Sequence, residues 1–101
     1  MPKITVNVPH ELGQQTAAER LQSFLARLKE KHQGQVSDLE EEWSGNALKF
    51  RFKTFGFQFQ GAGNVSDSDA KIDVDIPFAA MMFKGKIESE MRETLTRVLK
   101  S

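Results

Sequence analysis

The chain has 101 residues, enough for one domain in which folding buries roughly two thirds of the surface that the unfolded chain exposes. Its 14 basic and 14 acidic side chains cancel, which argues against a dedicated nucleic-acid or anionic-membrane binder. Cysteine is absent, which excludes disulfides, thiolate metal sites and a cysteine nucleophile. The first residues carry no basic and apolar leader, and no run approaches the ~20 apolar residues of a membrane span, so we expect a cytoplasmic protein.

A strand and a helix are the first two predicted elements. Apolar residues alternate with polar ones over residues 4–8, which predicts a half-buried strand that Pro9 ends. Over residues 16–28 the apolar residues recur at helical spacing instead. This change of period predicts an amphipathic helix that ends near Gly34.

The next forty residues alternate again and predict strands joined by turns. Gly45 and Asn46 suit a two-residue hairpin turn. That turn sets a register in which apolar faces apolar and acid faces base: Trp43 with Leu48, Glu42 with Lys49, Glu40 with Arg51, Leu39 with Phe52, and Asp38 with Lys53. Further turns at residues 55–56 and 67–69 complete a predicted four-stranded antiparallel meander.

A closing helix is predicted after an uninterrupted apolar run. Residues 78–83 have no polar side chain, and a charged stretch begins at Lys84. Apolar residues then recur at helical spacing from Ile87 to Leu99, so the helix should begin between Phe78 and Lys84. The predicted fold is a single α+β domain over residues 1–101, of order β-α-β-β-β-β-α, with two helices packed on one face of an antiparallel sheet, similar to a small helix-grip.

The apolar run is the first candidate for a functional site. Neighbours on a helix point about 100° apart, so six apolar residues in a row cannot all face one packed surface. The surplus is covered by the rest of the fold, by a partner or by an apolar ligand, and methionine suits both core gaps and irregular surfaces. Burial and interaction both remain open. The candidate interaction residues are Phe78, Met81, Met82, Phe83, Lys84 and Lys86.

A pocket on the inward face of the sheet is the second candidate. Alternation from Phe59 places Gly61 and Gly63 on that face, where neither contributes a side chain. Glycines in strands commonly mark a bulge or a closely crossing element, and a pocket floor is the alternative. In the latter interpretation the apolar walls are Trp43, Leu48, Phe50, Phe59 and Ile76.

Polar residues supply no complete catalytic or metal-binding arrangement. The hairpin register points Glu41 inward opposite Phe50, where a carboxylate could act as an acid or base, although a margin position or a bulge is the simpler explanation. His10 and His32 match no metal-binding or catalytic spacing. We therefore predict no catalytic residue, no metal site and no cofactor.

Neither a nucleic acid nor a membrane span is expected, whereas a second copy of the chain is compatible with the pattern. Lys49, Arg51 and Lys53 share one strand face, but the aromatic residues between them alternate away from it. Either the first strand or the strand of residues 38–43 forms a sheet edge that could pair to give a homodimer. Acidic residues on the second of these argue mildly against its use.

Three segments resemble a known family. They are Val-Pro-His-Glu-Leu-Gly at residues 8–13, Trp-Ser-Gly-Asn at residues 43–46, and Pro-Phe-Ala-Ala-Met-Met-Phe-Lys-Gly-Lys-Ile-Glu at residues 77–88. Over essentially the whole chain the sequence resembles the small bacterial polyhydroxyalkanoic acid system proteins, also called polyhydroxyalkanoate granule-region proteins. The resemblance implies a bacterial cytoplasmic protein linked to the making, storage or control of polyester granules, and it implies no catalytic residues.

Three functional hypotheses follow. The first is a non-enzymatic binding or regulatory protein that contacts the granule or a granule-coat protein through the apolar run. The alternative is a small domain that binds an apolar or acyl-type ligand in a pocket between the sheet and the C-terminal helix. A hydrolase or isomerase that uses Glu41 or His10 lacks a partner group that would complete a catalytic arrangement.

Overall fold

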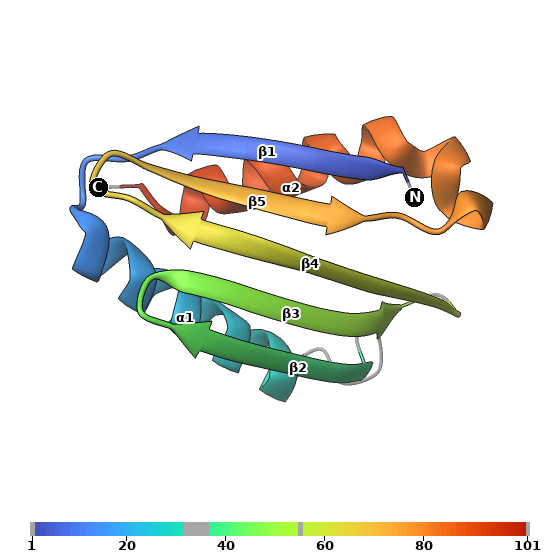
Figure 1. Ribbon diagram of the computed structural model, residues 1–101, viewed down its shortest axis with the longest axis horizontal. Coiled ribbons are helices and arrows are strands. Elements are labelled where there is room, and N and C mark those ends of the chain that lie inside the picture. Colours follow the sequence, from blue (N-terminus) through green and yellow to red (C-terminus); the bar gives the residue numbers. More distant parts are fainter. Residues whose placement is uncertain (1, 32–36, 55, 101) are drawn as a thin grey trace.

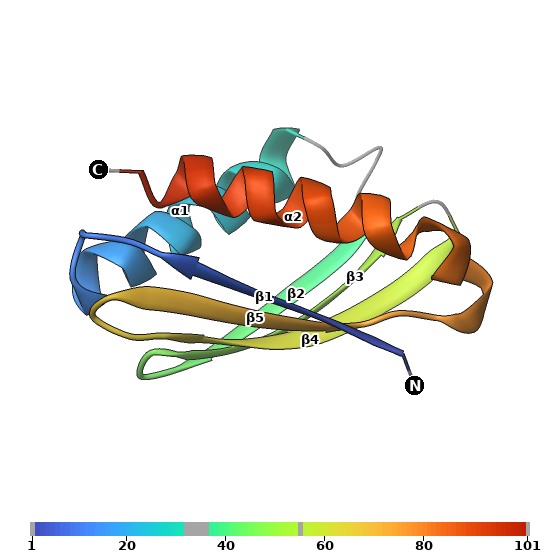
Figure 2. The same cartoon turned by 90° about the horizontal axis from the view of Figure 1, so that it is seen from above.

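The computed structural model describes residues 2–31, 37–54 and 56–100. Within them, one antiparallel sheet of five strands has the order β1-β5-β4-β3-β2, and two helices lie on the same side of it (Figures 1 and 2). This α+β architecture confirms the predicted fold class. The elements are β1 (Lys3–Pro9), α1 (Gln14–Lys31), β2 (Ser37–Ser44), β3 (Ala47–Thr54), β4 (Phe57–Val65), β5 (Asp69–Asp75), the 3-10 helix η1 (Phe78–Phe83) and α2 (Lys84–Val98).

The meander is confirmed, because β2, β3, β4 and β5 are neighbours in chain order. The first strand completes the sheet by pairing antiparallel with β5, so the chain's first and last strands lie side by side. α2 begins at Lys84, within the predicted range. The predicted end of the first helix near Gly34 and the predicted position of His32 lie outside the described residues.

The β2–β3 hairpin follows the predicted register near its turn and departs from it at the far end. Gly45 takes a positive φ of 63° in the two-residue turn, and Trp43 pairs with Leu48 as predicted. The predicted pairing of Asp38 with Lys53 is wrong, because the register shifts and Ser37 is the residue opposite Lys53. Between Ser37 and Glu40, β2 has two residues where β3 has one, which is a β-bulge, and Asp38 has a positive φ of 53° there.

The bulge does not separate the two charges that the sequence paired. Asp38 Oδ2 lies 3.6 Å from Lys53 Nζ, within ion-pair distance. Two exposed side chains of this length reach one another without being directly opposite in the sheet.

The core lies between the sheet and the helices. Every second residue of β1 and β5 is buried, which matches the alternation in the sequence. α1 and α2 close this layer from the other side with small and aliphatic residues. The buried residues include Ile4, Val6, Val8, Ala17, Leu21, Phe59, Val65, Ala70, Ile72, Val74, Ile76, Leu95 and Leu99.

Candidate apolar interaction site

η1 follows β5 and connects it to α2. Ile76 is fully buried and its N–H donates to the carbonyl of Pro2 at 2.8 Å, which fixes the chain at the end of the sheet. Pro77 then starts η1, since its ring sets φ near −59° and it accepts a hydrogen bond from Ala80 N–H at 2.9 Å. The segment therefore begins as a tight turn on a fixed anchor.

The geometry of a 3-10 helix explains why this segment cannot bury all its apolar side chains. With three residues per turn, side chains at positions i and i+3 lie in line, so the segment has three rows. Ala80, at 1% exposure, lies in the row that faces the core. The rows of Phe78 with Met81 and of Ala79 with Met82 face solvent, and the exposed fractions are 78% for Phe78, 39% for Met81 and 89% for Met82. Phe83 follows Ala80 in its row, but it is the last residue of η1 and is 51% exposed.

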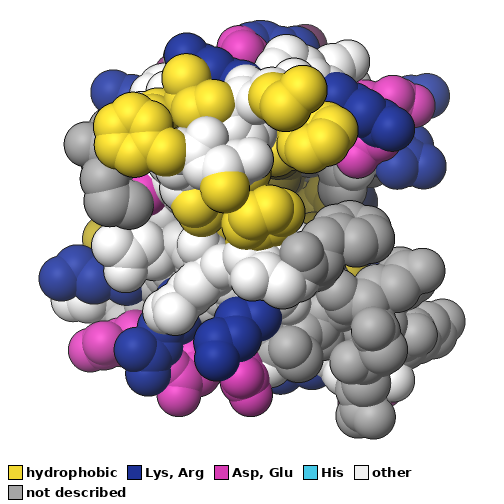
Figure 3. Space-filling model, turned by 90° about the vertical axis from the view of Figure 1, so that its right-hand side faces the viewer, with side chains coloured by type: hydrophobic (Ala, Val, Ile, Leu, Met, Phe, Trp, Pro, Cys, Tyr) yellow, Lys and Arg dark blue, Asp and Glu magenta, His cyan; other side chains and the backbone are white. Residues whose placement is uncertain are grey.

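The exposed side chains of η1 form the apolar site: Phe78, Met81, Met82 and Phe83. η1 lies at the right-hand end of the molecule in Figure 1. Figure 3 views that end directly and shows hydrophobic side chains gathered around a hollow. Exposed apolar surface gathered in one place is typical of interaction sites, whereas scattered single residues are not.

The first turn of α2 adds positive charge beside the apolar site. Lys84 and Lys86 are both exposed, and this turn contains no acidic residue. The N-cap residue, Phe83, makes no side-chain capping hydrogen bond to the helix. Because a helix N-terminus already has a partial positive charge, the two lysines make this border strongly electropositive.

Other groups already occupy the space directly above Gly61 and Gly63, where the sequence offered a pocket floor as the alternative interpretation. A Cβ built on Gly61 would overlap the backbone carbonyl of Asp73 and lie 2.8 Å from the Phe50 ring. A Cβ on Gly63 would lie 2.6 Å from Cδ1 of Ile72. The glycines therefore mark close approach of neighbouring groups, which was the simpler interpretation.

The predicted pocket walls belong to the core or its margin. Leu48, Phe59 and Ile76 are buried, while Trp43 and Phe50 are half-buried and pack against the same cluster. The Phe52 ring stacks between Phe50 and Phe59, with centroid distances of 6.2 and 5.3 Å. These residues therefore pack in the core or at its margin.

Glu41 lies opposite Phe50, as the hairpin register predicted, and is half-buried. Its Oε2 accepts a hydrogen bond from Trp43 Nε1 at 3.1 Å, and its Oε1 lies 3.8 Å from Lys29 Nζ of α1. Both carboxylate oxygens thus have partners, and the ion pair with Lys29 links β2 to α1. These two contacts give the inward-pointing Glu41 carboxylate a structural role.

His10 is buried and connects the loop after β1 to the β4–β5 turn. Its Nδ1 accepts a hydrogen bond from Leu12 N–H at 3.2 Å, so the proton of the neutral ring lies on Nε2. Nε2 then donates to the carbonyl of Ser66 at 3.0 Å. Both ring nitrogens are used in fixing this end of the sheet, which is a structural role.

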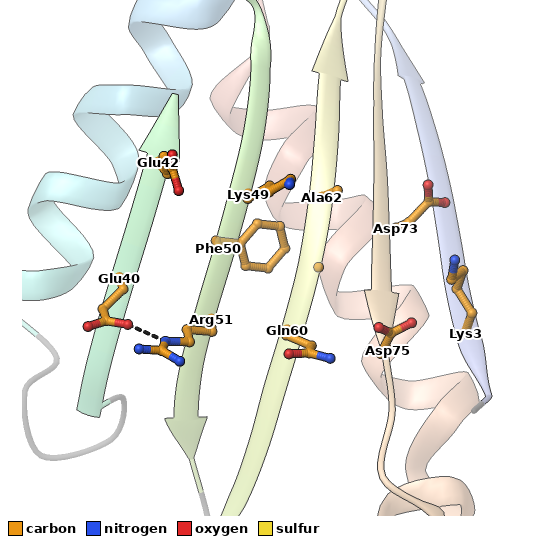
Figure 4. Close-up of a pocket in the computed structure, with 11 residues that line it drawn as sticks. Lys3, Glu40, Glu42, Lys49, Phe50, Arg51, Gln60, Ala62, Asp73 and Asp75 are labelled. Atoms are coloured by element: carbon orange, nitrogen blue, oxygen red, sulfur yellow. Dashed lines mark hydrogen bonds and ion pairs between the residues drawn. The ribbon is translucent and has the colours of Figure 1, made fainter. Parts of the chain in front are cut away.

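The outer face of the sheet has a shallow cavity of about 510 Å³ that the sequence did not predict. In Figure 4, Lys49 and Arg51 of β3 lie on one side of it and Asp73 and Asp75 of β5 on the other, with Gln60 between them. The opposite charges face one another across the cavity. It therefore has no field of a single sign to select a charged ligand. The alternation of residues along each strand places these side chains on one face of the sheet. The cavity itself depends on the twist of the whole sheet.

Arg51 also sets the ionisation of the opposing carboxylate. Its guanidinium donates a hydrogen bond to Glu40 (Figure 4). This hydrogen bond, together with the charge of Arg51, lowers the pKa of Glu40 below its ordinary value. The same contact raises the pKa of Arg51.

Two further kinds of site are absent from the described part of the chain. Residues 2–31, 37–54 and 56–100 contain no group of three His, Asp or Glu side chains arranged to hold a metal ion. Nor does any helix in these ranges have the length and apolar character needed to cross a membrane.

Comparison with known proteins identifies the family. The family described as “Putative polyhydroxyalkanoic acid system protein (PHA_gran_rgn)” matches residues 4–99. Searches of curated proteins and of solved structures found no significant match. The match to the family covers nearly the whole domain, including β1, the β2–β3 hairpin and η1. The chain therefore belongs to the family of polyhydroxyalkanoic acid system proteins.

Proposed function

We propose that this protein is a non-enzymatic, cytoplasmic binding or regulatory protein of the polyhydroxyalkanoate system, and that η1 contacts the polyester surface of the granule. The observation that carries the proposal is the exposure of Phe78, Met82 and Phe83 in one short element next to two exposed lysines. The family match supports the link to polyhydroxyalkanoate. The chemistry of the two surfaces supports the contact itself.

The chemistry of a polyester surface fits this site. A polyhydroxyalkanoate chain offers hydrocarbon groups and ester carbonyl oxygens, which accept hydrogen bonds but cannot donate them. η1 supplies apolar side chains, and Lys84 and Lys86 supply donors on flexible stems. Residues 78–87 contain no carboxylate that would be buried against the polymer.

The size of the site predicts a weak and reversible contact. Burying a large apolar side chain contributes about 2 kcal/mol, so Phe78, Met82 and Phe83 together contribute on the order of 5 kcal/mol. Loss of translational freedom on binding opposes this gain. Such a protein exchanges between the granule and the surrounding solution.

The test is a pelleting assay with amorphous polyhydroxybutyrate particles and purified protein. We expect Met82→Asp to weaken binding about 30-fold, since it loses one apolar contact worth about 2 kcal/mol. The thermal stability should stay close to that of the wild type, because Met82 is 89% exposed. Ser89→Asp is the matched control: it adds the same charge at an exposed position of α2 and should bind as the wild type does.

Three outcomes contradict the proposal. Wild-type protein that stays wholly in the supernatant, with bare particles and with native granules alike, excludes a granule contact. If the protein pelleted with native granules but not with bare particles, its partner would be a granule-coat protein and not the polyester. If Met82→Asp and the wild type bound equally, η1 would not be part of the contact.

A further inference from the structure

The sheet has two edges, and they differ in a way that bears on self-association. β2 forms one edge and β1 the other. β2 is interrupted by the bulge at Asp38 and exposes the carboxylates of Glu40 and Glu42. Bulges and charges of this kind are the usual means by which proteins prevent an edge strand from pairing with another chain. β1 has no bulge, since its register with β5 runs without a shift from Lys3 to Pro9, and Lys3 is its one charged residue.

The hydrogen bonds of β1 show which of its backbone groups are free for a partner. Pro2 accepts from Ile76 N–H, and His10 N–H donates to Ser68, so the even-numbered residues direct their backbone groups toward β5. In an antiparallel pair these groups alternate in direction along the strand. The N–H and C=O groups of Lys3, Thr5 and Asn7 therefore point away from the sheet.

This edge is accessible in the folded chain. Figure 2 looks at the sheet from the β1 side, and β1 crosses in front of β5 and β4 with α2 to one side of it. The helices cover a face of the sheet, so a strand added beside β1 would extend the sheet in its own plane.

We propose that β1 pairs with β1 of a second copy, antiparallel and about a two-fold axis at Thr5. This register places Thr5 opposite Thr5 of the second copy and Lys3 opposite Asn7 of the second copy. It is the symmetric register in which all three outward-pointing residues both donate and accept a backbone hydrogen bond. The two sheets then form one continuous sheet, with closed two-fold symmetry.

The side chains of β1 fit this register on both faces. On the open face the exposed side chains are Lys3, Thr5 and Asn7, so the pairs are Lys with Asn and Thr with Thr, with no like charges opposed. Thr–Thr pairs across strands are favourable. On the helix-covered face, Ile4 lies opposite Val6 of the second copy, which continues the apolar layer. A second copy of this chain is thus a partner of matching chemistry.

The first test is the mass in solution, measured by analytical ultracentrifugation over a range of concentrations. We expect a dimer of twice the 11.4 kDa chain for the wild type. Thr5→Pro should be monomeric, because proline removes the central outward N–H, while an edge strand tolerates proline where its N–H faces solvent. Thr5→Val, which also loses the hydroxyl bond to Asp73 but keeps the N–H, should remain a dimer.

The second test examines the register and does not depend on the proline variant folding. Asn7→Glu would place a carboxylate opposite Lys3 of the second copy at both ends of the contact, and Asn7→Lys would oppose two lysines there. We expect the glutamate variant to dimerise about 2- to 30-fold more tightly than wild type, and the lysine variant to be correspondingly weaker.

Three results would overturn the proposal. They are a monomeric wild type at every concentration, a dimer that survives Thr5→Pro, or equal dimer affinities for Asn7→Glu and Asn7→Lys. A dimer that Met82→Asp dissociates and Thr5→Pro does not would place the contact at η1 instead. The pairing is independent of granule binding, so failure of either proposal leaves the other standing.

Discussion

Gly61 and Gly63 of β4 have different neighbours, although the alternation of side chains along a strand places both on the same face of the sheet. Gly61 approaches a backbone carbonyl, that of Asp73, which belongs to the neighbouring strand and cannot move by itself. A Cβ on Gly63 would come too close only to the end of the Ile72 side chain, which rotates at little cost, while the Lys71 carbonyl and Leu48 would lie at ordinary contact distances of 3.4 and 3.8 Å. Neither has a positive φ, so space and not backbone conformation distinguishes them.

We therefore predict that Gly61→Ala destabilises the fold by about 1–3 kcal/mol, the usual cost of forcing an extra methyl group into a packed position. Gly63→Ala is the matched control and should change stability by less than about 1 kcal/mol, because Ile72 can adjust. Urea unfolding measures both free energies if the slope is unchanged. Equal effects of the two substitutions would show that the close approach of Asp73 has no energetic consequence.

At the scale of elements, the β2–β3 hairpin shows how charges act beside a bulge. The pairs near the turn keep the register, and Arg51 donates to Glu40 across the strands. The pKa of Glu40 is lowered in the folded protein. A lowered carboxylate pKa means that this pair contributes stability above the unfolded pKa and loses that contribution as pH falls through the folded pKa.

We predict that carbon-detected NMR titration finds the pKa of Glu40 below its ordinary value in wild-type protein and nearer to it in Arg51→Gln. The stability difference between these two proteins should be constant near neutral pH and should vanish in acid, once Glu40 is protonated. Lys49→Gln removes a charge from the same strand at a position with no ion pair among the described residues, and should leave Glu40 nearly unchanged. If the pKa of Glu40 were the same in the wild type and in Arg51→Gln, the hydrogen bond between Arg51 and Glu40 would be contradicted.

At the scale of the whole molecule, the fold places its two candidate surfaces apart. η1 lies at one end of the sheet, and the free backbone groups of β1 lie along one edge (Figures 1 and 2). Where a dimer through β1 leaves both copies of η1 uncovered, two binding segments on one particle raise the overall affinity through effective concentration.

Concentration dependence of the melting temperature follows from β1 pairing. A partner that binds only the folded chain stabilises it by mass action, so we predict that the wild-type Tm rises with protein concentration. Thr5→Pro should show a lower Tm that does not depend on concentration. Scanning calorimetry at several concentrations gives both results, and a constant wild-type Tm would contradict pairing in the folded state.

Prediction from sequence succeeded where neighbours in the chain decide the structure. The alternation of residues 4–8, the helical spacing of residues 16–28 and the Gly45-Asn46 turn led to the correct elements. The pairs Trp43 with Leu48 and Glu42 with Lys49 were predicted because a two-residue turn sets the register next to it. Farther from the turn, the bulge at Asp38 shifts the register, and no local sequence pattern predicted that bulge.

The sequence by itself determined the secondary structure, the meander and the fact that six consecutive apolar residues exceed what one packed face can hide, since period and turn chemistry are local properties of the chain. Only the tertiary structure decided that β1 lies beside β5, that Asp73 and Phe50 fill the space above Gly61, and that Phe78 and Met82 face solvent. Each of these depends on groups that are distant in sequence. Their positions follow from how the sheet twists and how the helices pack upon it, which no short window of residues contains.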